Sequence, residues 1–307
     1  MWEMPSRSFF NALKLVLIAL IALHPSFPAQ AKLKSATHRM TKSGSIAQGI
    51  TAAVYLSPSS TANTSPDRAV SKALEEARRL FKDLDAQSSG EVSQINKGAG
   101  KDKIKVSGPL LTLLKVCRQI TDWTHGLFDV VRGVSNKKDT LFVDFENNEV
   151  RLPTKKSWLD FTGIRNGYIV DRMAGMLKSQ GYSDFMVQMG DSTRTMGRDG
   201  ANYWRLNIPD VHGSQSGLCR VSLESSSVAT VNTRTLPQTK TDLRSVTVIT
   251  RNATNASALA RTAFLAGRSR AVAMLNPLAA QGFGVILEDG NGKIQTIGDV
   301  TAACFEE

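Results

Sequence analysis

The stretch LDFTGIRNGYIVD, residues 159–171, leads through a glycine-containing turn into a helix. Apolar residues recur at helical spacing from Ile169 to Leu177, and Gly181 ends the pattern. Taken alone, the stretch has a simple explanation, in which glycines make turns between core elements and aspartates cap helices. Its meaning depends on the segments around it.

Three further segments accompany this stretch in a fixed order. WTHGLFD, residues 123–129, follows a helix predicted to begin near Gly108. MGD, residues 189–191, is followed by Gly197 and a strand. The helix segment ASALART, residues 256–262, comes directly after a predicted strand. Each of these segments also has a simple explanation by itself.

The rest of the chain alternates between hairpins and helices, which favours an α+β fold over a doubly wound parallel sheet. Amphipathic spacing predicts helices, and short apolar or alternating runs predict strands. The predicted helices cover 66–84, 108–125, 169–180, 256–266 and 269–275, and the predicted strands cover 50–56, 140–145, 149–152, 185–187, 204–208, 218–223, 245–250, 284–287 and 293–297.

The N-terminus is predicted to be a secretory signal peptide, residues 1–31. A basic start is followed by the apolar run 15–23, and Ala29-Gln30-Ala31 forms a small-x-small cleavage site. Nine apolar residues are too few to span a bilayer, so no membrane span is expected after cleavage; an uncleaved interfacial anchor is the alternative. Residues 32–49 are polar and predicted to be a flexible arm before the domain at 50–307. The protein is expected to be periplasmic or secreted.

The composition of the chain excludes several classes of protein. With 41% hydrophobic and 21% charged residues in 307, the chain is expected to be soluble and globular. Its net charge of +11 favours anionic partners, but the basic residues are dispersed and not interleaved with aromatics, so no nucleic acid is expected. No C-x-x-C spacing exists among Cys117, Cys219 and Cys304. A disulfide between Cys219 and Cys304 is compatible with an oxidising compartment, and Cys117 is expected to be buried.

The common catalytic motifs are absent. Beyond the leader, the histidines are His38, His125 and His212, without H-E-x-x-H spacing. No G-x-S-x-G elbow, Walker loop or G-x-G-x-x-G turn is present. No catalytic residue is therefore assigned from the residues alone.

The order of the segments resembles the FAD:protein FMN transferase (ApbE-type) family, over about residues 70–298. Residues 90–96, GEVSQIN, resemble the family's S-E-(I/L)-S-x-L-N element, and 126–129 resemble its G-a-F-D element. Residues 159–171 resemble the L-D-L-G-G-I-A-K-G-Y-x-x-D element, and 190–197 the G-G-D element. The resemblance implies an α+β, ApbE-like (T-fold-like) architecture that mixes helices with antiparallel sheet.

Family members are exported, bind FAD in a cleft and use Mg²⁺ to move FMN onto a threonine of a partner protein. The resemblance therefore implies FAD and Mg²⁺ as cofactors and an exported acceptor protein as partner. It places FAD-binding positions at Leu127, Phe128, Asp129, Asp160 and Asn166. It places metal positions at Gly163, through its carbonyl, and at Ser257, Ala260 and Arg261.

The chain departs from the family at those positions. Ser257 replaces an aspartate that holds metal, Arg261 replaces a threonine, and Asn166 replaces a lysine that contacts the nucleotide. Ala86 replaces a tyrosine that stacks on the flavin. Residues 236–240 lack the His, Asp and Gly of the corresponding family segment. The segment between Asp129 and Asp160 is also shorter than is typical.

These departures leave two hypotheses. The first is a transferase with the family activity and a degenerate site; the second is an inactive pseudoenzyme that binds a flavin nucleotide or a partner. Losing the carboxylate weakens Mg²⁺ binding, and a guanidinium in the same pocket adds repulsion on the order of several kcal/mol at low dielectric. Mg²⁺ held instead by Asp191 or Asp129 is an alternative. Arg261 meets a phosphate, folds over the former cleft or pairs with Asp160.

Overall fold

The computed structural model describes residues 40–57, 62, 64–134, 140–211, 217–300 and 302–304. These residues belong to one compact unit, Leu33–Glu307. The predicted signal peptide, His38 and His212 lie outside the described residues. No helix in the described ranges is long and apolar enough to cross a membrane.

The largest element is an antiparallel sheet of eight strands in the order β1-β2-β8-β9-β12-β13-β14-β15. Its centre consists of strands whose residues are buried on both faces, such as β12 and β14. The strands are β1 (Met40–Ala47), β2 (Ile50–Leu56), β8 (Phe185–Met189), β9 (Ser192–Met196), β12 (Ser227–Asn232), β13 (Leu243–Thr250), β14 (Gly284–Asp289) and β15 (Ile294–Ile297).

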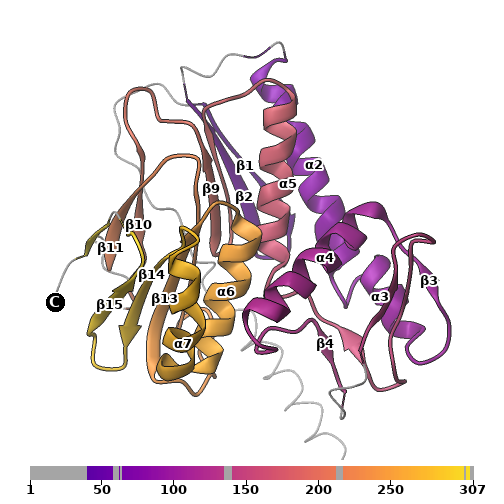
Figure 1. The fold of residues 1–307 in the computed structure, drawn as a ribbon. Helices are drawn as coiled ribbons and strands as arrows, with labels where there is room; N and C mark the ends of the chain where they lie inside the picture. The colour runs from indigo at the N-terminus through magenta and orange to yellow at the C-terminus, as the bar shows by residue number, and fades with distance from the viewer. Residues whose placement is uncertain are drawn as a thin grey trace, which may run out of the picture. The chain divides into compact units, whose positions relative to one another are not determined.

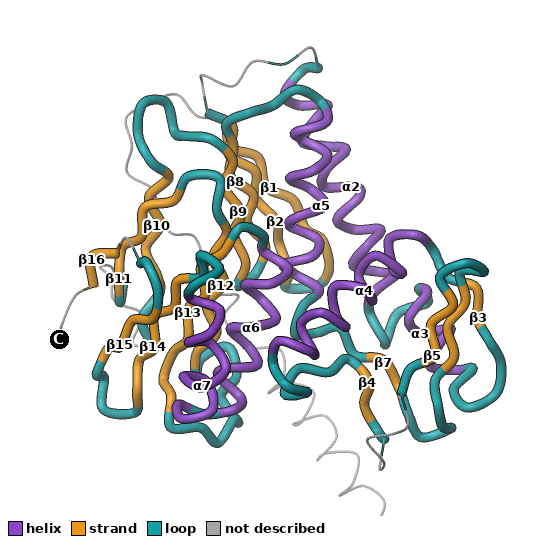
Figure 2. The backbone as a smooth tube through the Cα atoms, viewed as in Figure 1, coloured by secondary structure: helices purple, strands orange, loops and turns teal. Residues whose placement is uncertain are grey.

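Helices cover one face of this sheet and a small sheet covers the other. Figures 1 and 2 show α2 (Pro66–Leu84), α5 (Arg165–Ser179), α6 (Ala253–Ala266) and α7 (Arg268–Ala279) on the same side, where they enclose the main core. On the opposite face, a second core gathers around Trp204, between the large sheet and the strands β10 (Trp204–Ile208), β11 (Cys219–Leu223) and β16 (Ala302–Cys304).

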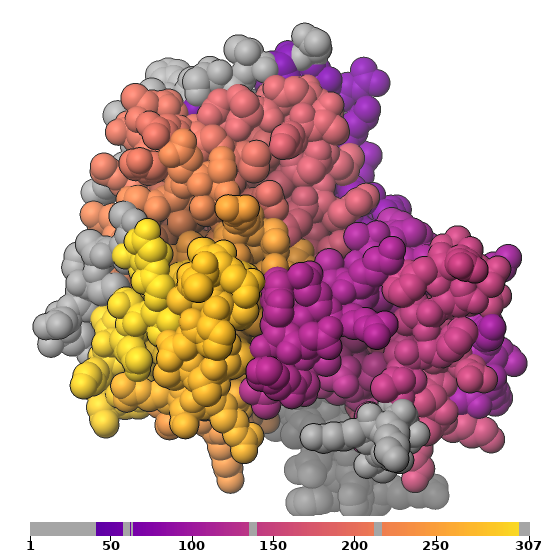
Figure 3. Space-filling view, in the orientation of Figure 1, coloured from indigo at the N-terminus to yellow at the C-terminus, as the bar shows by residue number. Residues whose placement is uncertain are grey.

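The remaining elements form a separate group, in which one helix packs against α2 and another against α6. They are α3 (Glu91–Lys97), α4 (Gly108–Trp123), β3 (Ile104–Lys105), β4 (Val131–Arg132), β5 (Phe142–Asp144), β6 (Glu149–Arg151) and β7 (Trp158–Leu159). The ring of Trp123 at the end of α4 meets Phe283 edge to face at 5.9 Å. In Figure 3, the magenta surface of this region accordingly adjoins the orange and yellow surface of the C-terminal elements.

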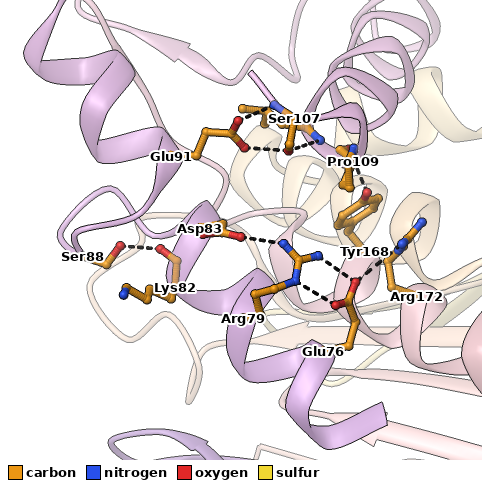
Figure 4. A network of polar contacts seen from close by, with 11 residues as sticks. Glu76, Arg79, Lys82, Asp83, Ser88, Glu91, Ser107, Pro109, Tyr168 and Arg172 are labelled. Carbon is orange, nitrogen blue, oxygen red and sulfur yellow. Dashed lines mark hydrogen bonds and ion pairs between the residues drawn. The ribbon is translucent and has the colours of Figure 1, made fainter. Parts of the chain in front are cut away.

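A polar network ties α5 to α2 and α4 (Figure 4). Arg79 donates two hydrogen bonds of 2.9 Å to the Glu76 carboxylate, and Arg172 of α5 lies 3.5 Å from the same carboxylate. The Tyr168 hydroxyl donates to the Pro109 carbonyl at 2.8 Å. Because the network reaches three helices, it fixes the position of α5, which begins at the site described below.

The predicted α+β class is confirmed, and most predicted helices and strands are present within a few residues. The prediction of a flexible arm was wrong for residues 40–47, which form β1 and pair with β2. This strand is polar because it lies at the edge of the sheet, with much of its length exposed to water, so it lacks the apolar alternation that predicts a strand. The short elements α3, β3, β4, β7, β9, β12 and β16 were not predicted.

The cysteines lie where the sequence placed them. Cys219 is disulfide-bonded, and β11 and β16 pair with Cys219 directly opposite Cys304 in the backbone register. Cys117 is free and buried on α4, and its burial raises the pKa of the thiol well above its usual value. The thiol is therefore protonated at neutral pH and serves as a core residue.

Candidate functional site

The site is built on the turn between β7 and α5. After Leu159, the Thr162 backbone N–H donates to the Asp160 carboxylate at 2.9 Å. The N–H groups of Ile164 and Arg165 both donate to the Phe161 carbonyl, which starts the helix. Phe161 and Ile164 are fully buried, so the turn is anchored in the core and Asp160 is held at its rim.

A cavity of about 430 Å³ opens beside this turn. It lies between the end of α2 and the β7–α5 turn, and its lining is mostly polar. The lining residues are Leu84, Asp85, Ala86, Gln87, Trp158, Asp160, Thr162 and Arg165. The cavity thus brings together Ala86 and Asp160, two positions that the resemblance assigns to the flavin nucleotide.

Arg165 forms one wall of the cavity. Its guanidinium lies 3.9 Å from the centre of the Phe81 ring and 3.4 Å from the Asp85 carboxylate. Burial lowers the pKa of Arg165, and the Asp85 and Asp160 carboxylates oppose that shift. Its Nε is buried and has no hydrogen-bond partner among the described residues. Arg165 therefore adds a positive charge to the cavity wall, and Asp85 partly offsets that charge.

Asp160 is ionised at neutral pH. Burial alone would raise the pKa of this carboxyl, but the Thr162 hydrogen bonds and the guanidinium groups of Arg132 and Arg261 hold it below its usual value. The nearest of these cations, Arg132, lies 3.9 Å from the carboxylate. The cavity lining therefore carries two carboxylates, Asp85 and Asp160, and one guanidinium, Arg165, with Arg132 and Arg261 acting on Asp160 from outside the lining.

Next to the cavity, a polar chain runs from α5 to α6. Asn166 donates to the Asp191 carboxylate at 3.1 Å, and the Ser192 hydroxyl donates to the same oxygen at 3.1 Å. Ser192 also lies 3.2 Å from the Ser257 hydroxyl, with both residues buried. Burial raises the pKa of Asp191, although Asn166, Ser192 and Arg261 oppose that shift.

Arg261 extends over the position that the resemblance assigns to the metal. A Cβ at Gly163 would lie 2.9 Å from Cδ of Arg261, so the arginine stem covers this glycine. Its charge helps to lower the pKa of Asp160 and opposes the rise that burial causes in the pKa of Asp191, so the guanidinium lies within electrostatic reach of both carboxylates. No hydrogen bond or ion pair in the described part of the chain occupies the guanidinium.

Two features place α6 against α5. A Cβ at Gly167 would lie 2.1 Å from the Ala253 carbonyl oxygen and 2.8 Å from Cβ of Ser257, so only glycine permits this approach. The Asp171 carboxylate accepts hydrogen bonds from the Ala253 and Thr254 N–H groups at 3.0 and 2.8 Å. These bonds satisfy two N–H groups at the start of α6 and so fix the positions of Ser257 and Arg261 relative to α5.

The structure thus brings together Asp160, Gly163, Asn166, Ser257 and Arg261 from the predicted site residues. The other predicted positions lie elsewhere. Ala260 is fully buried in the main core, Phe128 is buried, and Leu127 is exposed. Asp129 accepts a hydrogen bond of 2.8 Å from the Val131 N–H and so closes a local turn. These four side chains do not line the cavity among the described residues.

The residues at the metal positions do not fit Mg²⁺. Ser257 offers a hydroxyl that already interacts with Ser192, and Arg261 brings a positive charge. Within the described ranges, no cluster of three or more His, Cys, Asp or Glu residues could hold a metal ion. Magnesium is bound by several hard oxygen ligands, which usually include one or two carboxylates. The cavity, by contrast, combines the Arg165 guanidinium and the Trp158 ring with two carboxylates.

Sequence reasoning missed Trp158, Arg165 and Ser192. Trp158 precedes Asp160 by two residues, and this spacing puts both side chains on one face of an extended segment. That signal was available in the sequence. Arg165 and Ser192 gave no such signal, because their roles depend on where α2 and α6 pack.

Comparisons with known proteins place these residues in context. The model of the ApbE family matches residues 134–286. A curated FAD:protein FMN transferase from Vibrio cholerae serotype O1 is 28% identical over 176 residues, 47% of this chain and 52% of that protein. The chain thus aligns with about half the length of this relative.

Solved structures resemble the whole fold. The flavin transferase ApbE from Vibrio cholerae has a TM-score of 0.68 at 19% identity, covering 85% of this chain and 97% of its own. The apo flavinyl transferase ApbE from Pseudomonas stutzeri has a TM-score of 0.69 at 17% identity, covering 85% and 95%. The ApbE protein from Thermotoga maritima has a TM-score of 0.71 at 18% identity, covering 85% and 97%. At these identities the likeness shows the fold alone.

Proposed function

The chain belongs to the ApbE family, and from this premise we propose that it binds FAD in the cavity beside Asp160 without the family's metal-dependent transfer of FMN. Transfer of FMN from FAD to a protein is the activity named for the curated relative. The proposal keeps the nucleotide ligand of that activity and changes how the site holds it.

The position of Arg261 is the observation that carries this proposal. Its side chain covers Gly163 and its guanidinium has no partner among the described residues. A guanidinium binds a diphosphate through charge-assisted, often bidentate hydrogen bonds. It can therefore offset the ligand's negative charge where family members use Mg²⁺. It has no counterpart to the metal's Lewis acidity, so it holds the diphosphate without activating it as a metal does.

The cavity supports the nucleotide part of the proposal. Arg165 contributes a positively charged side chain to its lining, and Trp158 contributes an aromatic ring. The protein's net charge of +11 also favours an anionic ligand. Bound FAD would therefore lie with its diphosphate toward Arg261 and a ring system in the cavity.

A second candidate function is the transferase activity itself, directed at an exported acceptor protein. The curated relative's name favours it, and Asp191 is a carboxylate close to the polar chain. Against it, the Asp191 carboxylate already accepts hydrogen bonds from Asn166 and Ser192, and the charge of Arg261 repels a cation.

We further propose that the chain is exported to the periplasm or beyond the cell. The signal-peptide pattern at 1–31 supports this location. The disulfide of Cys219 supports it as well, because structural disulfides persist mainly in oxidising compartments. Intact-mass measurement of the exported protein should give a chain that starts at Lys32.

A transfer assay tests the proposal. The protein is incubated with FAD, Mg²⁺ and a threonine-containing acceptor that the Vibrio cholerae transferase modifies, and the acceptor's mass is then measured. We expect no added FMN with this protein and full addition with the Vibrio cholerae enzyme as control. Bound FAD should nevertheless colour the protein after removal of free ligand. Addition of FMN to the acceptor by this protein would establish the second candidate instead.

A further inference from the structure

Trp158 occupies an unusual position for a large apolar side chain. It lies on β7, where its neighbour Leu159 is fully buried, so the alternation of the strand turns the indole away from the core. The same alternation puts Trp158 and Asp160 on one face, and both line the cavity. The tryptophan is 46% exposed, and part of its ring is therefore free to contact a ligand.

The orientation of the indole is fixed by Gly133. This glycine has a φ of +72°, and a Cβ on it would lie 2.5 Å from Cζ3 and 2.8 Å from Cε3 of Trp158. The benzene edge of the indole therefore rests directly on the glycine backbone. A ring held in this way loses little conformational entropy when a second ring stacks on it.

No other residue of the cavity provides such a surface. Ala86 has only a methyl group, and Trp158 carries the sole aromatic ring in the lining, as far as the described residues show. The Arg165 guanidinium is already occupied on one side by the Phe81 ring at 3.9 Å. Stacking in this cavity therefore depends on Trp158.

Two arginines lie near this ring, and the carboxylates Asp85 and Asp160 line the same cavity. Arg132 is directly opposite Trp158 in the register of β4 and β7, and Arg165 lines the same cavity. A planar ring that carries phosphate satisfies both features, because its ring stacks on the indole and its phosphate meets the guanidinium groups.

We propose that Trp158 is the stacking platform of this protein: the planar heteroaromatic ring of a phosphate-bearing ligand lies against the indole, which replaces an aromatic side chain at position 86. The flavin ring and the adenine ring of FAD share this chemistry. The inference rests on the proposed binding of FAD and adds the residue that recognises the ring.

Titration of FAD into wild type, Trp158→Ala and Trp158→Phe tests the proposal. Loss of a base–aromatic stack raises Kd about 5- to 150-fold, which we expect for Trp158→Ala, whereas Trp158→Phe keeps a ring and should stay within about threefold of wild type. Tyr203→Ala is the matched control, because Tyr203 is an aromatic residue of similar exposure, 49%, that does not line the cavity. It should bind FAD as wild type does.

Fluorescence provides a second measurement that does not depend on the alanine variant folding. FAD should quench part of the tryptophan emission of wild type, and this quenching should be lost in Trp158→Phe although the ligand still binds. Parallel titrations with FMN and with ADP identify the ring: sensitivity to Trp158→Ala with FMN assigns the flavin, and sensitivity with ADP assigns the adenine.

The outcomes separate this inference from the proposed function. Equal FAD affinity in wild type and Trp158→Ala overturns the stacking role and leaves FAD binding intact. An equal loss in Trp158→Ala and Trp158→Phe also overturns it, since a ring would then not suffice. Absence of FAD binding by the wild-type protein overturns the proposed function and this inference together.

Discussion

Arg261 stands one helical turn after Ser257 on α6, and the two residues together define the chemistry of the site. Ser257 is buried and interacts with Ser192, so its hydroxyl belongs to the polar chain that joins α5 and α6. Arg261 covers Gly163 from the same side. A carboxylate at 257 would add a negative charge to the site. A small hydroxyl side chain at 261 would remove a positive charge and uncover Gly163.

The double variant Ser257→Asp, Arg261→Thr is expected to gain affinity for a divalent cation. It adds one carboxylate beside Asp191 and removes one positive charge, and each change favours a hard cation. Mn²⁺ titration followed by electron paramagnetic resonance should show binding at least about tenfold tighter than in wild type.

Ser257→Asp alone is the control for this experiment. Its new carboxylate would face the retained guanidinium of Arg261, so Mn²⁺ affinity should rise less than in the double variant. If the double variant binds Mn²⁺ no better than wild type, the substituted ligands do not explain the loss of the metal site. Adding Asn166→Lys to the double variant tests whether transfer of FMN returns.

At the scale of the elements, the site depends on where α6 begins. Asp171 on α5 caps this helix and also pairs with Arg194 of β9. The side chains of Asp171 and Arg194 are only 16% and 24% exposed, so water screens the pair poorly. A single carboxylate thus links two helices and the large sheet.

Asp171→Asn is expected to lower the free energy of unfolding by about 2 kcal/mol, because a neutral amide weakens the cap and leaves Arg194 without its counterion. Urea unfolding followed by circular dichroism measures this change. Asp67→Asn is the matched control, since Asp67 is 75% exposed and pairs with the partly exposed Lys42 at 3.3 Å. It should change stability by less than about 0.5 kcal/mol. Equal effects in the two variants would contradict the role of Asp171.

The lowered pKa of Glu76 predicts how the stability of the α2–α5 contact depends on pH. Hydrogen bonds from Arg79 lower the pKa of this carboxyl, and the charges of Arg79 and Arg172 add to the shift against the effect of burial. A lowered pKa gives stability that is present above the unfolded value of 4.5 and is lost as the pH falls through the folded value.

Glu76→Gln should therefore destabilise the protein by about 1 kcal/mol at pH 7, a modest amount because both arginines are partly exposed. The difference from wild type should shrink as the pH falls below 4.5. Urea unfolding at a series of pH values measures it. A difference that is constant between pH 7 and pH 3 would show that the charge of Glu76 does not stabilise the contact.

Local sequence patterns were enough to predict most helices and strands. They failed for elements and site residues whose position depends on tertiary packing. The helix ending at Ser179 and the strand Trp204–Ile208 carry clear periodicity, so they were predicted well. Strand β12 carries no alternation because it is buried on both faces. Asp160, Asn166 and Arg261 were identified from their place in motifs, whereas Arg165 depends on the packing of Phe81 and Asp85, which no local pattern encodes.

At the scale of the whole described chain, the fold resembles that of ApbE proteins although the sequences differ widely. The ApbE structures match the fold with TM-scores of 0.68 to 0.71 at 17 to 19% identity. In this chain, Gly167 permits the close approach of α5 and α6, and the buried Ser257 lies at that contact. The fold therefore accommodates a serine at 257 and an arginine at 261.

We propose that Arg261 takes over the charge-neutralising role of a metal when FAD binds. Isothermal titration of FAD into the purified protein, once with excess EDTA and once with excess Mg²⁺, tests this role. We expect FAD binding in both titrations with Kd values that agree within about twofold, because a guanidinium holds the diphosphate without a cation. Binding that occurs with Mg²⁺ and disappears with EDTA would contradict it.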